Sequence, residues 1–203
     1  MIGKGKKQTM KQYVVGITGA SGSIYGLRTV EALLEGGARV RLILTGTGEK
    51  VVAYETGREA GDWIDDFKKR FRSQLILEDN NDLFSAAASG SHLTDGMIIA
   101  PCSMSKLAHI AAGITPDLMT RAADVALKQR RPLVLMPRET PLSQIHLKNM
   151  LTLAECGAFI VPAMPAFYQK PECLDDMADF MAGRVLDCLG VENRRYPRWK
   201  EEE

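Results

Sequence analysis

The chain has 203 residues, of which 45% are apolar and 25% are charged. This length and usage are typical of one globular domain with a substantial core. The formal net charge of +1 excludes a strong long-range field toward nucleic acid or an anionic membrane. No apolar run approaches the roughly 20 residues of a membrane span. We therefore expect neither nucleic acid nor membrane as a partner, and look for local ligand sites.

The cysteines and histidines are isolated from one another. The four cysteines form no C-x-x-C pair, which is typical of reduced thiols in a cytoplasmic protein. They are Cys102, Cys156, Cys173 and Cys188. The three histidines show no metal-binding spacing, so we expect no metal site. Residues 1–12 are basic and lack an apolar signal region, and we predict a disordered tail before a single domain over 13–203.

The first half of the chain alternates short apolar runs with amphipathic segments. Trp63, Phe67 and Phe71 follow one another at intervals of four residues, which predicts one aromatic stripe on a helix. Predicted strands cover 13–18, 40–44 and 75–77, and further predicted helices cover 23–35 and 49–56.

The second half repeats this alternation. Its predicted strands cover 97–100, 133–136 and 159–161, and each is followed by a proline. Its predicted helices cover 103–112, 117–129, 142–156 and 174–189. Continuous apolar strands that alternate with helices indicate a parallel sheet buried on both faces. We therefore predict an α/β fold with three layers, a Rossmann-like parallel sheet between two layers of helices.

Unusual residues follow five of these strands. Ligands of open parallel sheets bind beyond the carboxyl ends of the strands. We call the five segments the carboxyl rim and predict the functional site there. They are residues 18–22, 45–48, 101–103, 137–139 and 162–168.

The first segment of the carboxyl rim contains Gly19 and Gly22. It fits either a phosphate cradle at a helix N-terminus or a plain strand–helix turn. The dinucleotide fingerprint is absent, and Thr45 stands where an acid would bind ribose, which disfavours NAD. A Tyr-x-x-x-Lys motif of short-chain reductases occurs only at Tyr196–Lys200, where Pro197 interrupts it. The P-loop is also missing, whereas a mononucleotide such as FMN remains compatible.

Several basic residues occupy positions that either ligand binding or an ordinary structural role could explain. Arg121 neighbours small apolar residues and should have an anionic partner. Lys128 fits a helix C-terminus, where the helix dipole favours a cation. Arg138 and Glu139 follow a strand directly. They fit either a pair that faces a ligand or a salt bridge on the surface. Arg184 lies near the apolar face of the last helix, as a ligand or a side chain that extends to solvent.

Taken together, the motifs resemble those of the UbiX flavin prenyltransferases from about residue 13 to 199. The resemblance implies a flavodoxin-like fold and a dodecamer with sites at subunit interfaces. It implies transfer of a dimethylallyl group from dimethylallyl phosphate to N5 and C6 of reduced FMN. The prenylated FMN would pass to a UbiD-type decarboxylase. The motifs are VGITGASGSIYG at 15–26, SGS at 89–91, APCS at 100–103, TRAADVALK at 120–128, RRPLVL at 130–135, PRETP at 137–141, PAFY at 165–168 and PRW at 197–199.

The resemblance also implies roles for individual residues. The residues implied to hold FMN are Gly19, Ala20, Ser21, Thr45, Ser89, Gly90, Ser91, Cys102, Ser103 and Arg121. The residues implied to bind the substrate phosphate are Lys128 (from a neighbouring subunit), Arg138, Tyr168 and Arg184. The implied catalytic set is Ser21, Glu55, Arg138, Glu139 and Tyr168, in which Glu55 and Glu139 handle protons. Trp199 would cover the site.

The implied chemistry suits these residue types. Guanidinium and ammonium groups stabilise a departing phosphate without a metal. The aromatic rings of Tyr168 and Trp199 favour an allylic cation. Glu139 or the released phosphate could remove the C6 proton, and exclusion of water would protect the cation.

One segment departs from the family pattern. Family members commonly have Ser-Lys-Ala after the second strand, whereas this chain has Thr45-Gly46-Thr47. Two alternatives stay open: a decarboxylase of aromatic or cysteine-derived acids, or a non-catalytic FMN-binding subunit of a decarboxylase. The cysteine-type decarboxylases carry Asn after a P-x-M segment, and here Pro165 follows Met164, which disfavours them.

Overall fold

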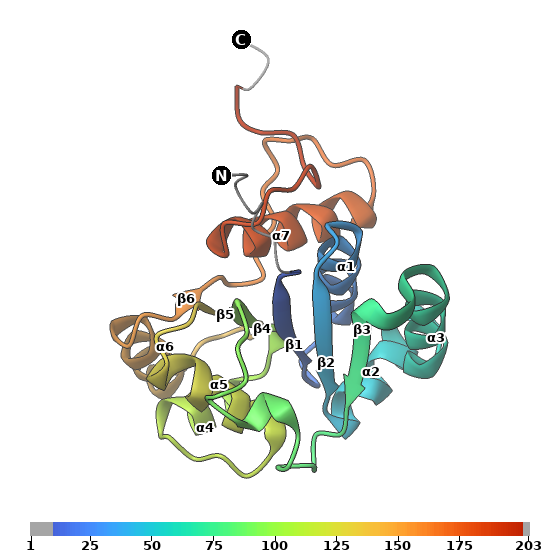
Figure 1. Ribbon diagram of the computed structural model, residues 1–203. Coiled ribbons are helices and arrows are strands. Elements are labelled where there is room, and N and C mark those ends of the chain that lie inside the picture. Colours follow the sequence, from blue (N-terminus) through green and yellow to red (C-terminus); the bar gives the residue numbers. More distant parts are fainter. Residues whose placement is uncertain (1–9, 201–203) are drawn as a thin grey trace, which may run out of the picture.

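The computed structural model describes residues 10–200, which form one six-stranded sheet between two layers of helices (Figure 1). All neighbouring strands are parallel, in the order β3-β2-β1-β4-β5-β6. This is the doubly wound order with a switch point between β1 and β4. The strands are β1 Gln12–Ile17, β2 Arg39–Leu44, β3 Leu75–Glu78, β4 Gly96–Cys102, β5 Leu133–Pro137 and β6 Phe159–Ile160. The predicted fold class is confirmed.

The strands are apolar on both faces because helices cover both faces. Every residue of β4 and β5 is buried. All six predicted strands are present, within two residues of their predicted ends. One boundary was wrong, because Gln12 belongs to β1 although it was predicted to lie in the tail. Residues 1–9 of that predicted tail lie outside the described residues.

The helices divide into two layers (Figure 1). The apolar sides of α1, α2, α3 and α7 join one core, and those of α4, α5 and α6 join the other. Their bounds are α1 Ser23–Glu35, α2 Gly46–Thr56, α3 Ala60–Phe71, α4 Met104–Ala111, α5 Leu118–Lys128, α6 Gln144–Glu155 and α7 Leu174–Cys188. Among the described residues, no helix combines the length and apolarity that a bilayer span requires.

Two details of the helix prediction are informative. The aromatic stripe on α3 is confirmed, since Phe67 is buried and Trp63 and Phe71 pack against the same core. Helix α2 starts three residues earlier than predicted. The reason is the Thr45 hydroxyl, which accepts a hydrogen bond from the Gly48 N–H at 3.0 Å and so caps the helix N-terminus.

Helix α1 packs unusually close to the sheet. A Cβ atom at Gly26 would lie 2.1 Å from the carbonyl oxygen of Ala100 in β4. Only glycine permits this contact. Because of it, the start of α1 lies at the switch point, beside the carboxyl ends of β1 and β4.

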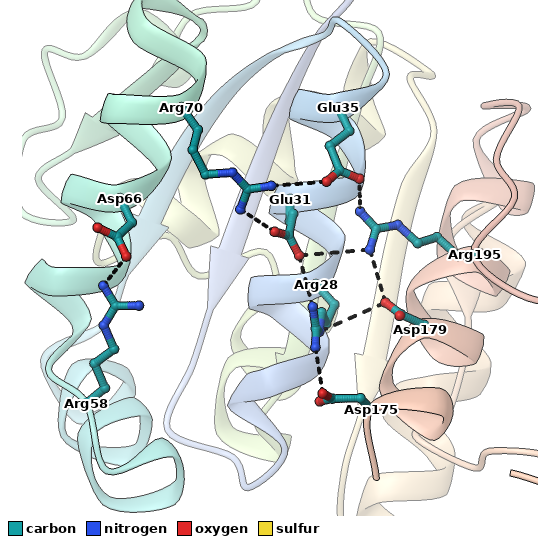
Figure 2. A network of polar contacts seen from close by, with 9 residues as sticks. All are labelled: Arg28, Glu31, Glu35, Arg58, Asp66, Arg70, Asp175, Asp179 and Arg195. Carbon is teal, nitrogen blue, oxygen red and sulfur yellow. Dashed lines mark hydrogen bonds and ion pairs between the residues drawn. The ribbon is translucent and has the colours of Figure 1, made fainter. Parts of the chain in front are cut away.

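A polar network joins α1 to α3, α7 and the C-terminal segment (Figure 2). Arg70 of α3 donates to both Glu31 and Glu35 of α1. Arg28 contacts Asp175 of α7 at 3.0 Å. Arg195, which follows α7, contacts Glu35 and also Asp179 at 3.2 Å.

Glu31 is the most enclosed carboxylate of this network, with 11% of its side chain exposed. Burial by itself raises the pKa of Glu31, but hydrogen bonds from Arg70 and Arg28 outweigh burial and lower the pKa below its usual value. A lowered pKa means that the carboxylate stabilises the folded state above the unfolded-state pKa, and that this stability is lost as pH falls through the folded-state pKa.

We predict that Glu31→Gln lowers the free energy of unfolding by about 2 kcal/mol at pH 7, because the mostly buried guanidinium groups of Arg28 and Arg195 and the half-exposed one of Arg70 lose a charged acceptor. Chemical denaturation measures the change. The difference from the wild type should narrow as pH falls below about 4.3. Asp66→Asn, at an exposed pair with Arg58 shown in Figure 2, is the control and should cost less. An equal loss in both variants would contradict a special role for Glu31.

Candidate active site

The ends of β1 and β4 are joined by one hydroxyl group. The Thr18 hydroxyl donates to the Pro101 carbonyl oxygen at 2.8 Å and accepts from the Ser103 N–H at 2.9 Å. Ser103 in turn caps α4, since its hydroxyl accepts from the Lys106 N–H. These bonds fix two segments of the carboxyl rim against each other at the switch point.

In the loop between β1 and α1, Ser21 is the side chain that is exposed to solvent. The Ala20 side chain is buried, whereas Ser21 is exposed. Gly19 lies tightly against α2, since a Cβ atom there would meet the Thr47 methyl group at 2.4 Å. Gly22 has a φ of 95°, a conformation that disfavours other residues and turns the chain into α1. Any ligand at Gly19 or Ala20 would therefore contact main chain.

The carboxylate of Glu55 in α2 caps the N-terminus of α1. Its carboxylate accepts from the N–H groups of Gly22 at 3.0 Å and Ser23 at 2.8 Å, and from the Ser23 hydroxyl at 2.7 Å. Burial raises the pKa of Glu55, but hydrogen bonds from Ser21 and Ser23 outweigh burial and lower the pKa. Glu55 is thus a carboxylate at neutral pH, held at the positive end of a helix dipole.

This arrangement contradicts the phosphate-cradle explanation of the first loop. The N–H groups of Gly22 and Ser23, which a phosphate would need, already bind a carboxylate. The plain-turn explanation was incomplete as well, because the turn is closed by a side chain from the next helix. The spacing of glycines could not reveal this partner, which lies 33 residues further along the chain.

Two other predicted FMN contacts are constrained by their surroundings. The Cys102 side chain is fully buried, and burial raises the pKa of its thiol to about 12, so the thiol stays protonated. A ligand contact of Cys102 would use its main chain. The Thr45 hydroxyl is occupied as the cap of α2, though a hydroxyl has a second lone pair for a ligand.

Arg138 and Glu139 both extend into solvent after β5. Glu139 accepts from the Thr140 N–H at 3.0 Å, and the described contacts show no salt bridge between it and Arg138. Together with Leu142, Met150 and Met164, the pair lines a cavity of about 130 Å³. A ligand the size of a nucleotide usually needs at least roughly 300 Å³, so this cavity encloses only part of one.

A second group of predicted residues lies along α5. Arg121 donates from Nε to the Ala88 carbonyl oxygen at 3.2 Å and pairs with Asp124 at 2.9 Å. The hydroxyls of Ser89 and Ser91 bond each other at 2.8 Å, and both residues are exposed. Gly90 packs against Gln129, which follows the last residue of α5. We call Ser89, Ser91, Arg121 and Lys128 the α5 patch.

A third group lies on α7. The rings of Tyr168 and Trp199 meet edge to face, with centroids 5.1 Å apart. Arg184 has half of its side chain exposed and donates to Asp187 at 3.2 Å and to the Tyr196 hydroxyl at 3.3 Å. Tyr168 ends the last segment of the carboxyl rim, so Trp199 contacts the rim. We call Arg184 and its partners Asp187 and Tyr196 the α7 patch.

Within one chain, the end of α7 is far from the carboxyl rim. Leu189 lies against Gly96 at the start of β4, and Arg195 reaches Glu35 at the last turn of α1. In Figure 1, α7 lies at the end of the sheet where β1 begins, whereas α2 lies beyond the opposite end. The 13 residues of α1 separate these two levels by about 20 Å. Arg184 and the carboxyl rim therefore do not form one pocket within a single chain.

Sequence reasoning missed two carboxylates, Asp124 and Asp187. Each lies three residues after a predicted ligand-binding arginine and pairs with it across one helical turn. That spacing is visible in the sequence and could have identified both. Among residues 10–200, no three His, Cys, Asp or Glu side chains gather as a possible metal site.

Comparison with known proteins gives consistent matches. Residues 2–186 match the family model described as Flavoprotein. The "Flavin prenyltransferase UbiX" of Methanothermobacter thermautotrophicus is 46% identical over 192 residues, covering 95% of this chain and 97% of the relative.

Two crystal structures are similar over nearly the whole chain. One is AnUbiX (PadA1) in complex with FMN and dimethylallyl pyrophosphate, with a TM-score of 0.88 and 38% identity, covering 96% of this chain and all of that one. The other is a dodecameric FMN-dependent Ubix-like decarboxylase from Escherichia coli O157:H7, with a TM-score of 0.84 and 42% identity, covering 93% of this chain and 98% of that one.

We predict that Glu55→Gln lowers the free energy of unfolding by about 1 kcal/mol at pH 7, because the α1 N-terminus loses its anion, and the partial exposure of Glu55 limits the effect. Because the pKa of Glu55 is lowered, the loss should vanish as pH falls below the folded-state value. Thermal and urea unfolding measure it. Glu49→Gln, an exposed residue of the same helix, is the control. No pH dependence of the difference would contradict the assignment.

Proposed function

Because this chain belongs to the Flavoprotein family and, within it, to the UbiX flavin prenyltransferases, we propose that it joins a dimethylallyl group from an allylic phosphate to reduced FMN in a site shared between subunits. The enzyme class and the flavin follow from the family. The donor phosphate, the residues and the sharing of the site are the parts that we infer from this chain.

The observation that carries the proposal is the set of donors that Arg121 of α5 forms with the exposed Ser89 and Ser91 of the segment before β4. The Arg121 guanidinium lies near the exposed hydroxyls of Ser89 and Ser91, since it donates to the carbonyl oxygen of Ala88, one residue before Ser89. Hydroxyls and a guanidinium are the donors that a phosphate monoester prefers. This set therefore fits the phosphate of FMN, in place of the first loop, whose N–H groups bind Glu55.

Reduced FMN, when bound, supplies the nucleophilic N5 and C6 atoms. The protein's task is to make the phosphate of the donor leave. The allylic C–O bond breaks, its electron pair departs with the phosphate, and the carbon bonds to N5. We assign Arg138, Lys128 and Arg184 to the departing phosphate, because fixed cations stabilise charge that develops as the bond breaks.

The remaining groups protect and complete the reaction. The rings of Tyr168 and Trp199 offer aromatic faces that favour an allylic cation. Ring closure bonds C6 to the tertiary carbon of the added group after that alkene takes up the proton released at N5. We assign Glu139, exposed beside Arg138, to accept the proton that C6 then loses. Ser21 is the exposed side chain of the first loop, and Glu55 holds that loop in shape. We therefore assign Glu55 to positioning rather than to proton transfer.

A site shared between subunits accounts for the three separate groups. Arg138 on the carboxyl rim and Arg184 near the end of α7 lie at different ends of the sheet within one chain, so we infer that a second copy supplies one of them. The chain also exposes large apolar side chains on α6 and in the last segment of the carboxyl rim. They include Ile145, Leu147, Leu151, Met164 and Phe167. We infer an oligomer, with a dodecamer as the precedent among similar structures.

The compartment, the prenyl donor and the recipient of the product are proposed from the same family. All four cysteines are free thiols, which supports a reducing compartment, and we assign the protein to the cytoplasm. We propose dimethylallyl monophosphate as the donor and a UbiD-type decarboxylase as the recipient of prenylated FMN.

We predict that wild-type protein with reduced FMN and dimethylallyl monophosphate yields flavin carrying one five-carbon unit, detected by mass spectrometry. Arg138→Ala and Glu139→Ala should retain FMN yet slow product formation at least about 100-fold, because each removes a group that acts on the reacting atoms. Arg39→Ala, an exposed arginine at the amino end of β2, is the control. Full turnover in both rim variants, or flavin without added carbon in the wild type, would contradict the proposal.

We predict that two inactive variants complement each other. Arg138→Ala damages the carboxyl rim and Arg184→Ala damages the α7 patch. Co-expressed in equal amounts, they should recover about a quarter of wild-type activity, since random assembly places an intact rim beside an intact patch at that fraction of the interfaces. Separately purified variants that are mixed without exchange are the control. Activity that stays at the level of the single variants would show that the site is not shared.

A further inference from the structure

We propose that Asp187 is a positioning residue, which holds Arg184 and the C-terminal segment of residues 193–199 in the arrangement that binds the donor phosphate. We call residues 193–199 the C-terminal strap. This inference rests on the proposed function, because it assumes that Arg184 and Trp199 serve the site.

One carboxylate connects the helix to the strap. Asp187 accepts from Arg184 of the same helix at 3.2 Å and from the Tyr196 hydroxyl of the strap. Arg198 donates to both of its oxygens, at 2.7 and 2.8 Å, and the Asn193 amide donates at 3.0 Å. Four side chains from both elements therefore converge on one acidic group.

Arg184 is fixed from two directions by this arrangement. It donates to Asp187 and to the Tyr196 hydroxyl, and that hydroxyl donates to Asp187 in turn. The three groups form a closed ring of hydrogen bonds. A half-exposed arginine has many rotamers, and a ring of this kind limits them, so less entropy is lost when a phosphate binds.

The contacts of Tyr196 and Arg198 also determine the position of Trp199 in the strap. The Tyr196 ring is buried against Phe180 and α7, so the strap is anchored just before Trp199. Arg198 precedes Trp199 directly and is bound to Asp187, and Trp199 then meets the ring of Tyr168. Asp187 thus sets the position of Arg184 and, through Arg198, of Trp199.

The strap has a second anchor that does not involve Asp187. Arg195 contacts Glu35 of α1 and Asp179 of α7, as Figure 2 shows. Loss of Asp187 should therefore leave the strap attached while its end becomes misplaced. This separates a positioning effect from general unfolding.

Asp187 is ionised at neutral pH. Burial alone raises its pKa, but hydrogen bonds from Arg198, Tyr196 and Asn193 outweigh burial and lower the pKa. Replacement by asparagine keeps the size of the side chain and removes the charge, which weakens every one of these bonds.

The test compares Asp187→Asn with wild-type holoenzyme in steady-state kinetics with reduced FMN and dimethylallyl monophosphate. We expect KM for the monophosphate to rise about tenfold with kcat changed less than about threefold, because a misplaced ligand weakens binding more than the chemical step. The dissociation constant of FMN should be unchanged, because the α5 patch and the carboxyl rim are intact.

A matched control lies on the same helix. Asp175→Asn makes the same chemical change at a carboxylate that pairs with Arg28 of α1 (Figure 2). It should leave KM unchanged. A milder variant, Tyr196→Phe, keeps the buried ring and removes the hydroxyl of the hydrogen-bonded ring. Tyr196→Phe should also raise KM, by a smaller factor than Asp187→Asn. It tests the inference even if Asp187→Asn folds poorly.

The possible results distinguish a failure of the proposed function from a failure of the positioning role of Asp187. If wild-type protein adds no five-carbon unit to FMN, the proposed function fails. If wild-type protein is active but Asp187→Asn and Tyr196→Phe both keep the wild-type KM, or if Asp175→Asn raises KM equally, only the positioning role of Asp187 is overturned. A rise of KM in the first two variants alone supports it.

Discussion

The contact between Gly26 and the Ala100 carbonyl decides where everything else at the carboxyl rim lies. With no Cβ atom in the way, α1 descends onto β4 and brings its N-terminus to the switch point of the sheet. The free N–H groups at that N-terminus must then be satisfied. In this chain Glu55 satisfies them from α2, which in turn fixes α2 beside the loop at 19–22. A larger residue at position 26 would displace α1, its bound carboxylate and both neighbouring loops together.

The charges of the molecule follow a common scheme. A net charge of +1 leaves no general attraction for anions, so each predicted anion site needs its own cations. In α5 and α7 these cations are paired with carboxylates one turn further on, Arg121 with Asp124 and Arg184 with Asp187. Such partly exposed pairs contribute little to stability. Their larger effect is to hold a long side chain in one orientation, so that a phosphate meets a guanidinium that is already aligned.

The sequence predicted the fold almost completely, because its signals are local. Apolar runs mark the strands, prolines follow the last three predicted strands, glycines follow several helices, and the parallel order follows from the alternation of strands and helices. The site was predicted as a list of residues but not as an arrangement. The partner of the α1 N-terminus, Glu55, lies 33 residues away from Gly22, and no local pattern connects them. The burial of the Cys102 thiol depends on both cores meeting at β4, which a run of apolar letters does not reveal.

The separation of the predicted residues into three groups has a topological cause. In a parallel sheet each helix returns the chain from the carboxyl end of one strand to the amino end of the next, so residues late in a helix lie far from the rim. Lys128 ends α5 and Arg184 is in the last two turns of α7, and both therefore point away from the rim of their own chain. No rearrangement within such a fold brings a helix C-terminus to that rim. A second copy can do so by packing against it, and the proposed use of Lys128 and Arg184 as phosphate ligands therefore predicts an oligomer.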